Sequence, residues 1–155
     1  MITLRNAATA EDIATIRELF TEYQSWLQFS LCFQGFDKEL AELPGKYAPP
    51  AGRLLLAEAD GVICGCIALR PFDGEGVCEM KRLFVREAFR GRGIGRMMTE
   101  QIVAEARAIG YHTMRLDTLQ RMEEARALYR QLGFTETPAY YDNPLDGVVY
   151  LELQL

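Results

Sequence analysis

The sequence predicts an α/β fold, in which a mixed β-sheet carries helices on its faces. Two apolar runs flank Asp60-Gly61, a dipeptide typical of a tight hairpin turn. A strand-like run over 77–85 passes through a glycine-rich turn into an amphipathic helix, and another strand-like run follows at 112–119. Parallel strands need a crossover of this kind, so we expect a parallel, right-handed strand–helix–strand unit at the centre.

The composition limits the class of protein. The chain has 155 residues, of which 49% are hydrophobic and 25% charged, as expected for one globular domain over residues 1–155. A net charge of −5 argues against a general affinity for nucleic acid. No stretch approaches the ~20 apolar residues of a membrane span. The start, "MITLRNAATAEDI", lacks the order of a signal peptide. We therefore expect a cytoplasmic protein without nucleic-acid or membrane partners.

The first third of the chain predicts a short strand at 2–5 and then a helix. Thr9 and Asp12 have the spacing of a capping box at the helix start. The apolar residues that recur at helical spacing are Ile13, Ile16, Phe20, Tyr23 and Leu27. The aromatic segment 25–50 follows, with a short helix expected over 37–43 and a Pro/Gly loop at its end. Such a segment contacts a ligand or caps a core, and both interpretations stay open.

The remaining elements follow from the same patterns. The hairpin covers 53–72, and a third strand covers 77–85. The helix after the glycine-rich turn presents one apolar face, made of Ile94, Met98, Ile102, Ala106 and Ile109. Gly110 is a natural terminator for it. A strand at 112–119 leads to a second helix with apolar residues Ala125, Leu128, Tyr129 and Leu132. A closing strand is expected within 146–155.

The cysteines and the single histidine argue against a metal centre. Cys64 and Cys66 are two residues apart, so a regular strand would place both on one face. That spacing is neither a zinc nor a redox motif, and we interpret the cysteines as buried core thiols. His112 is the only histidine, which rules out a zinc site with several histidine ligands. No metal site is expected.

The glycine-rich turn at 90–96 has the physical character of a phosphate site. The first N–H groups of a helix lack intrahelical partners, and the helix dipole is positive there. Glycines let an anion approach that backbone closely. A dinucleotide-binding fingerprint starting at Gly91 would need glycine or alanine where Arg96 stands, and the chain contains no P-loop string. The alternative is a tight turn that merely needs glycine.

One known family fits this turn. The string Arg90-Gly91-Arg92-Gly93-Ile94-Gly95 matches the pattern Q/R-x-x-G-x-G/A, and "KRLFV" precedes it while "ARALYRQLGF" follows. These motifs resemble the GNAT superfamily of N-acetyltransferases over essentially the whole chain. The resemblance implies a single-domain GNAT-like fold with a mixed, mostly antiparallel central sheet, helices on both faces and a central β-α-β cofactor unit. It also implies acetyl-CoA as co-substrate.

The resemblance assigns the cofactor contacts. Backbone N–H groups of the turn would hold the CoA pyrophosphate, and the end of the strand over 77–85 would align the pantetheine arm as a pseudo-strand. The implied cofactor-binding residues are Leu83, Phe84, Val85, Arg90, Gly91, Arg92, Gly93, Ile94, Gly95 and Arg96. The chain departs from the family pattern at Met122, where many members carry an asparagine that contacts the cofactor.

Two residues are candidates for catalysis. By resemblance, Tyr129 would protonate the departing CoA sulfur, although its spacing alone favours a core tyrosine. The Val85 N–H would stabilise the oxyanion. Glu79 matches the position of a glutamate base in some members, and an ion pair with an arginine is the alternative. Regular alternation places Glu79, Lys81, Leu83 and Val85 on one face of the strand, with Met80, Arg82 and Phe84 on the other.

The acceptor is less defined. By resemblance its pocket is built from the first helices and the last loops, which contribute Tyr23, Trp26, Phe29, Tyr140 and Tyr141. Aromatic rings favour an apolar or cationic ligand, whereas Lys81 and Arg82 favour a carboxylate or phosphate.

The predicted function is transfer of an acetyl group from acetyl-CoA to a primary amine, by direct attack, on a small molecule or amino-acid-like acceptor. The alternatives are acetylation of a protein or peptide amine and a non-catalytic acyl-CoA-binding module. A homodimer is common in the family, and nothing in the sequence specifies one.

Overall fold

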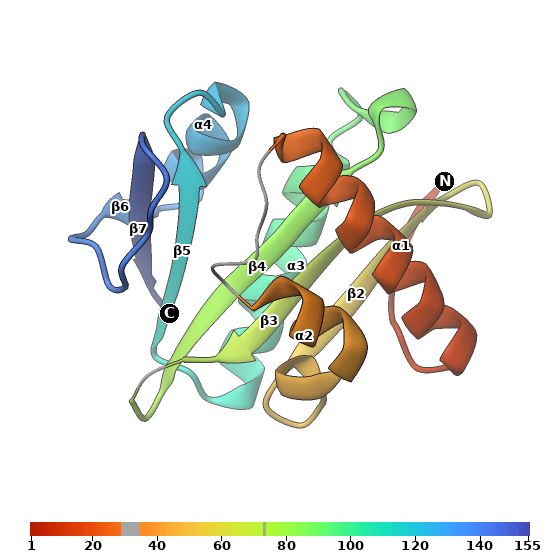
Figure 1. Ribbon diagram of the computed structural model, residues 1–155, viewed down its shortest axis with the longest axis horizontal. Helices are drawn as coiled ribbons and strands as arrows, with labels where there is room; N and C mark the ends of the chain where they lie inside the picture. The colour runs from red at the N-terminus through yellow and green to blue at the C-terminus, as the bar shows by residue number, and fades with distance from the viewer. Residues whose placement is uncertain (29–34, 73) are drawn as a thin grey trace.

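A computed structural model describes residues 1–28, 35–72 and 74–155 (Figure 1). The described residues form a seven-stranded sheet in the order β1-β2-β3-β4-β5-β7-β6. The strands are β1 (Ile2–Asn6), β2 (Arg53–Ala59), β3 (Val62–Pro71), β4 (Val77–Val85), β5 (Thr113–Leu119), β6 (Thr135–Glu136) and β7 (Val148–Gln154). Neighbouring strands are antiparallel except for β4 and β5, which are parallel. The predicted α/β class with a mostly antiparallel sheet is confirmed.

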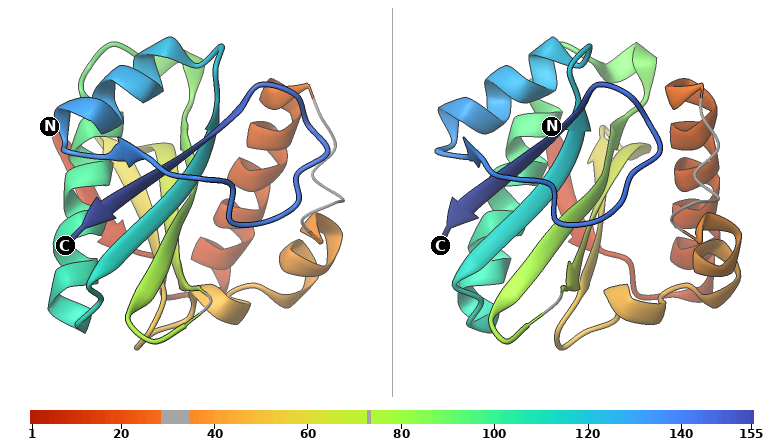
Figure 2. Two further views of the ribbon diagram at one scale, coloured as in Figure 1. Left: turned by 90° about the vertical axis from the view of Figure 1, so that its left-hand side faces the viewer. Right: turned by 60° about the vertical axis from the view of Figure 1, so that its left-hand side comes forward.

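Helices cover both faces of the sheet. The helices are α1 (Ala10–Leu27), α2 (Phe36–Glu42), α3 (Ile94–Ile109) and α4 (Glu123–Gln131), with short 3₁₀ turns η2 (Gly45–Tyr47) and η3 (Glu87–Phe89). Helices α1 and α2 lie on one face, and α3, which connects β4 to β5 along the chain, lies on the other (Figures 1 and 2). No helix in the described ranges is both long and apolar enough to cross a membrane.

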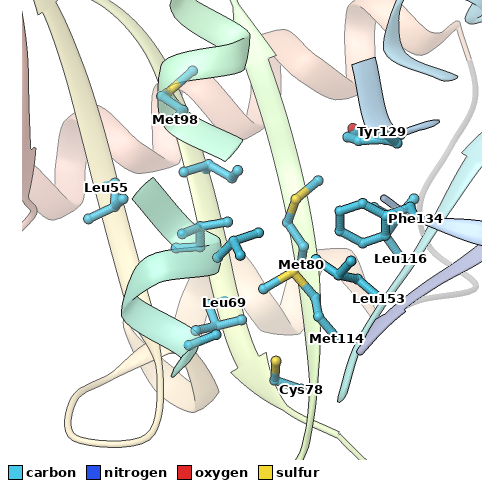
Figure 3. Packing of buried hydrophobic residues seen from close by; sticks show 14 of the residues in the cluster. Leu55, Leu69, Cys78, Met80, Met98, Met114, Leu116, Tyr129, Phe134 and Leu153 are labelled. Atoms are coloured by element: carbon cyan, nitrogen blue, oxygen red, sulfur yellow. The ribbon is translucent and has the colours of Figure 1, made fainter. Parts of the chain in front are cut away.

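Two apolar clusters hold these layers together. On the α3 and α4 face, fully buried residues such as Met98 and Ile102 pack against Leu69 and Met114 of the sheet (Figure 3). On the α1 and α2 face, a second cluster contains Ile16, Phe20, Phe36, Leu56 and Phe84. Each such side chain contributes about 1.5–3 kcal/mol when it leaves water. The sheet is therefore fixed from both sides.

The start of α1 has the predicted capping box. The Thr9 hydroxyl accepts a hydrogen bond from the Asp12 N–H at 3.0 Å, and the Asp12 carboxylate accepts from the Thr9 N–H at 3.2 Å. The same carboxylate accepts from the Ala8 N–H and from Arg5, each at 2.9 Å. These donors, the Ala8 N–H foremost, lower the pKa of Asp12 from 3.8 to about 2.

The hairpin turns at Asp60-Gly61 as predicted, but one of its strands is irregular. The β2–β3 register shifts between Ala57 and Glu58, which interrupts side-chain alternation near Gly65. Cys64 consequently belongs to the α3-side cluster and Cys66 to the α1-side cluster. The prediction that both face the same side is wrong, because a bulge breaks the period of two. Both are buried free thiols, as is Cys78, while Cys32 lies outside the described residues.

Asp12→Asn should lower the free energy of unfolding at pH 7 by about 1 kcal/mol, because the neutral amide replaces a charged cap. Since the native pKa of Asp12 is lowered, its charge stabilises the fold above pH 3.8, and this contribution is lost as the pH falls toward about 2. Urea unfolding should therefore show a difference in the free energy of unfolding between wild type and variant. This difference should disappear as the pH falls from 3.8 toward about 2. Glu11→Gln, an exposed change in the same helical turn, is the control. Its free energy of unfolding should stay close to that of the wild type at any pH.

Candidate active site

The parallel ladder between β4 and β5 is short. It runs from Val77–Thr113 to Glu79–Arg115 and then stops. Strand β5 continues to pair with β7 on its other side as far as Leu119. The upper halves of β4 and β5 diverge in Figure 1. Among the described residues, no strand pairs with residues 80–85 of β4 on the β5 side.

Strand β4 carries a bulge where the ladder has ended. Its register with β3 passes from Ala68–Lys81 to Cys66–Phe84, so β4 contains one extra residue. Arg82 accommodates this residue with a left-handed φ of 60°. Beyond the bulge the faces exchange: Leu83 and Val85 join Met80 on the α3 side, and Phe84 packs on the α1 side. The regular alternation predicted for this strand is wrong for that reason.

The end of β4 presents its backbone to the gap beside β5. The Arg86 N–H donates to the Cys64 carbonyl of β3 at 2.8 Å. Peptide groups alternate in direction along a strand, so the N–H and C=O groups of Leu83 and Val85 point the opposite way, toward β5. The Val85 carbonyl accepts a hydrogen bond from Arg90 Nε at 2.9 Å. This edge is suited to pair with an extended ligand.

The glycine-rich turn lies next to that edge. Gly91 and Gly93 adopt left-handed φ values of 80° and 78°, and Gly93 caps the N-terminus of α3. A Cβ placed on Gly91, Gly93 or Gly95 would meet no described atom within 4 Å. The free N–H groups of the first helical turn thus border open space, as an anion site requires.

A cleft of about 700 Å³ joins the strand edge to this turn. The predicted cofactor-binding residues that line it are Leu83, Phe84, Val85, Arg90, Gly91, Gly93, Ile94, Gly95 and Arg96. Arg92 is the exception, since its guanidinium lies over the Phe89 ring at 5.3 Å. Met122 also lines the cleft, and its sulfur accepts a hydrogen bond from the Thr118 hydroxyl at 3.5 Å.

Tyr129 extends from α4 to the wall of the same cleft. It is 5% exposed and packs edge-to-face on Phe134, with ring centroids 5.7 Å apart (Figure 3). Burial raises the pKa of its phenol, so the hydroxyl keeps its proton at neutral pH. Within the described residues no group forms a hydrogen bond with this hydroxyl. The residue is therefore part of the core and also lines the cleft, and its role as the acid stays a prediction.

Glu79 lies in a different environment. It is fully buried, and its Oε1 accepts from Arg70 Nε at 2.9 Å and Nη2 at 2.7 Å. Its Oε2 accepts from the Tyr140 hydroxyl at 2.8 Å and lies 3.8 Å from Lys81 Nζ. Glu79 is not among the described residues that line the cleft. The contacts favour the ion-pair alternative, and the role of Glu79 as a base stays a prediction.

The predicted acceptor residues divide into four groups, one of which is Tyr140, which donates to Glu79 and is not among the described residues that line the cleft. Tyr23 and Trp26 of α1 line the cleft. Tyr141 reaches it indirectly, through a 2.7 Å hydrogen bond to the Asp117 carboxylate. Phe29 lies outside the described residues. The 137–147 segment that carries Tyr141 leaves the edge strand β6 and passes across β7 and β5 toward β4 (Figure 2).

Four charged residues that line the cleft were not predicted from the sequence, and two of them are Glu123 and Glu124 at the start of α4. Asp117 on β5 and Arg121 after it both line the cleft. An acidic residue within the apolar strand "TMRLDTL" is the signal for Asp117, since such a charge needs a partner or a function. Its importance depends on the divergence of β4 and β5, which no local pattern reveals.

Two arginine–glutamate pairs fasten the α1 and α2 face to β4. Arg82 donates to both carboxylate oxygens of Glu39 on α2, each at 3.0 Å. Arg86 donates to both oxygens of Glu22 on α1, at 3.0 and 2.7 Å. Bidentate pairs of this kind fix direction as well as distance. The α1 wall of the cleft, and α2 on the same face of the sheet, are therefore positioned by the strand that carries the backbone edge of the cleft.

An open strand edge beside a glycine-lined helix N-terminus defines a class, the acyltransferases that take their acyl group from CoA. The fold agrees with solved structures. A GNAT-family acetyltransferase from Staphylococcus aureus superposes with a TM-score of 0.80 at 18% identity, covering 99% of each chain. The PaiA N-acetyltransferase of Thermoplasma acidophilum, solved with coenzyme A, gives 0.76 at 19% identity, covering 100% of this chain and 99% of that one.

The sequence comparisons give the family itself. The model of the acetyltransferase (GNAT) family matches residues 13–134. An N-acetyltransferase of Schizosaccharomyces pombe is 40% identical over 146 residues, which is 94% of this chain and 90% of that protein. The chain belongs to the GNAT family and is an acetyl-CoA-dependent N-acetyltransferase. The predictions of family, enzyme class and co-substrate are confirmed.

Glu79→Gln tests which role Glu79 has. The variant removes the charge that Arg70 and Lys81 share as a counter-ion. The free energy of unfolding should therefore fall by on the order of 3 kcal/mol. The pH–rate profile should overlay that of the wild type. Arg70→Gln removes the cationic partner of the same ion pair and should lower the free energy of unfolding by a similar amount. A Glu79→Gln enzyme that is slow at neutral pH and recovers as the pH rises would instead identify Glu79 as the base.

Proposed function

We propose that the protein acetylates a primary amine of a small molecule or amino-acid-like acceptor, by direct attack of the amine on the thioester. One observation carries the proposal: the open β4 edge, the glycine-rich turn and the Tyr129 hydroxyl share one cleft. The described lining contains no serine or cysteine that would form a covalent acetyl-enzyme. Direct attack needs only a base, an oxyanion donor and an acid.

The cofactor side of the cleft accounts for the binding of acetyl-CoA. The N–H groups at the start of α3 would hold the pyrophosphate, supported by the helix dipole. The N–H and C=O groups of Leu83 and Val85 would pair with the amides of the pantetheine arm, as an added strand does. This arrangement would bring the thioester to the end of β4, beside the Val85 N–H. That N–H would donate to the carbonyl oxygen as negative charge develops on it.

Tyr129 would complete the reaction on the leaving-group side. Its hydroxyl carries a proton at neutral pH, because burial raises its pKa. Packing against Phe134 fixes the ring, so the hydroxyl needs little reorganisation to reach the departing sulfur. Donation of this proton would keep the CoA thiolate from attacking the new amide.

The direct test of the proposed function is release of the free CoA thiol over a panel of amines. Turnover with small amines, and none with peptides that carry a free N-terminal or lysine amine, would support the proposal. Binding of acetyl-CoA without thiol release for any amine would contradict it and leave a non-catalytic acyl-CoA-binding protein.

Gly93→Leu tests the phosphate site. Its side chain would fill the open space before α3, so the dissociation constant for acetyl-CoA should rise at least about 10-fold in calorimetry. Gly110→Leu is the matched control, because Gly110 caps the opposite end of α3 with a φ of 111° and also borders open space. Both variants carry about 1–2 kcal/mol of backbone strain. Equal acetyl-CoA affinity in the two variants would refute the phosphate-site assignment.

Tyr129→Phe tests the acid. The ring and its packing remain, so the melting temperature should change little while kcat falls roughly 10²-fold or more. Tyr111→Phe is the control: it removes a hydroxyl that donates to the Ala51 carbonyl, away from the cleft, and should leave kcat unchanged. Full activity of a well-folded Tyr129→Phe enzyme would restrict Tyr129 to a role in the core.

A further inference from the structure

The Arg90 guanidinium lies on an aromatic surface of the cleft. Its Cζ is 4.9 Å from the centroid of the Trp26 ring and 5.8 Å from that of the Phe84 ring. The ring of Tyr23 extends this surface, because it stacks on Trp26 at 6.3 Å and meets Phe84 edge-on at 6.0 Å. All four residues line the cleft. The rings of Tyr23, Trp26 and Phe84, which we call the aromatic surface, therefore border the space that the ligands would occupy.

Arg90 is held on this surface without a carboxylate. Among the described residues, the one hydrogen bond of its guanidinium goes from Nε to the Val85 carbonyl at 2.9 Å, and no acidic side chain forms an ion pair with it. By contrast, Arg82 and Arg86 from the same end of β4 each pair with a glutamate. Ring faces attract cations electrostatically. The aromatic surface therefore already binds one positive group of the protein itself.

Acetyl-CoA would compete with Arg90 for this position. Arg90 Nε occupies the place at the Val85 carbonyl where an amide of an added strand would donate. The co-substrate also brings a new partner, since its pyrophosphate would lie at the glycine-rich turn that follows Arg90. A guanidinium can bind a phosphate through two parallel hydrogen bonds, whereas it makes one to the carbonyl. Binding of acetyl-CoA would therefore draw Arg90 away and leave the aromatic surface open to the acceptor.

The other charges that line the cleft are compatible with a cationic ligand. The lining cations besides Arg90 each have a partner: Lys81 with Glu79, Arg82 with Glu39, Arg96 with Glu100, and Arg121 with the Leu27 carbonyl. The lining carboxylates are those of Asp117, Glu123 and Glu124, and across the described ranges none of them forms an ion pair. Asp117 also acts electrostatically on Lys81 and on Tyr23 of the aromatic surface. A positive group on this surface would therefore gain attraction from Asp117 as well as from the rings.

The aromatic surface lies beside the place of reaction. Phe84 directly precedes Val85, whose N–H would stabilise the oxyanion, so a cation on the surface would be a short alkyl chain away from the thioester. The reacting nitrogen has to lose its proton before it attacks, so it is not the group that stays charged. A second alkylammonium, with a pKa near the value of about 10.4 for lysine, keeps its proton at neutral pH. An acceptor that uses this surface would therefore carry two basic groups.

We propose that the aromatic surface binds a cationic group of the acceptor once acetyl-CoA has displaced Arg90, so that the acceptors are amines with a second basic group. Alkyl diamines are the simplest members of this class. Without acetyl-CoA, the Arg90 guanidinium occupies the subsite in place of the acceptor. This inference rests on the proposed function and names its acceptor class.

The displacement of Arg90 is tested by fluorescence, because Trp26 is the only tryptophan in the chain. Saturation with CoA should change the Trp26 emission of the wild type as the guanidinium leaves the ring. In Arg90→Ala the emission should differ before any ligand is added, and the response to CoA should be at least about 3-fold smaller. Arg107→Ala, an exposed change at the opposite end of α3, is the control and should respond as the wild type does. Equal responses in Arg90→Ala and wild type would overturn the displacement.

The acceptor class is tested with 1,4-diaminobutane and butylamine, which have the same chain length. Calorimetry in the presence of CoA measures their binding without turnover, and the wild type should bind the diamine at least about 10-fold more tightly. Without CoA this preference should be absent in the wild type and present in Arg90→Ala, where the subsite is open. Equal binding of the two amines to the wild-type CoA complex would overturn the proposal, and a lack of preference in CoA-free Arg90→Ala would overturn the role of Arg90.

Two variants of Trp26 test the ring itself. Trp26→Leu keeps an apolar side chain but no ring face, so the preference for the diamine should fall at least about 5-fold. Trp26→Phe keeps a ring and should retain most of the preference. Because Trp26 is 43% exposed, both variants should fold. A full preference in Trp26→Leu would place the cation site elsewhere and contradict the inference.

The two levels of inference fail separately. Selective binding of the diamine without release of the CoA thiol would contradict the proposed function but support the cation subsite. Turnover of both amines at equal kcat/KM would support the proposed function and overturn the acceptor class.

Discussion

Strands β4 and β5 pair over three residues and then separate, and the functional geometry of the molecule depends on that separation. A fully paired sheet would satisfy the backbone of residues 80–85 internally and leave no edge for an extended ligand. The bulge at Arg82 adds the second requirement, because it turns Leu83 and Val85 toward the α3 side just where the ladder has ended. The cleft, its backbone edge and its two walls all follow from these irregularities.

Charged pairs, together with the apolar contacts of Phe84, connect the end of β4 to α1 and α2. Arg82 and Arg86 come from the irregular end of β4, and their carboxylate partners lie on α2 and α1. Burying such pairs costs desolvation energy, so they are weak evidence for stability. They do specify direction, since a bidentate guanidinium–carboxylate contact tolerates little rotation. The consequence is that one strand sets the position of the α1 wall of the cleft relative to the backbone edge of β4.

Much of the fold could be predicted from the sequence, because its signals are local. The capping box at Thr9, the Asp60-Gly61 turn and the glycine-rich start of α3 each depend on residues within a few positions of one another. The bulges were missed for a physical reason: an extra residue on one strand is decided by the partner strand. Gly65 shows this, since a Cβ there would lie 2.6 Å from the Phe84 carbonyl oxygen of β4.

The site was predictable where motif and geometry coincide, as at the glycine-rich turn, and not where distant segments meet. Among the described residues, the hydrogen-bond donors to Glu79 come from β3 and from the 137–147 segment, and the donor to Asp117 comes from that segment. Strand alternation identifies neither set, because it describes one strand at a time. A charge in an apolar strand indicates that a partner exists, but the fold decides which one.

The contact between Arg90 and the Val85 carbonyl has a consequence for the protein before its co-substrate binds. A bare strand edge is a template on which a strand of another copy can add, and unpaired edges are a common origin of aggregation. The Arg90 guanidinium covers this carbonyl while lying over the rings of Trp26 and Phe84, 4.9 and 5.8 Å from their centroids. The Arg90 guanidinium thus hinders self-association at this edge of β4. A ligand with better hydrogen-bonding geometry can displace it from the Val85 carbonyl.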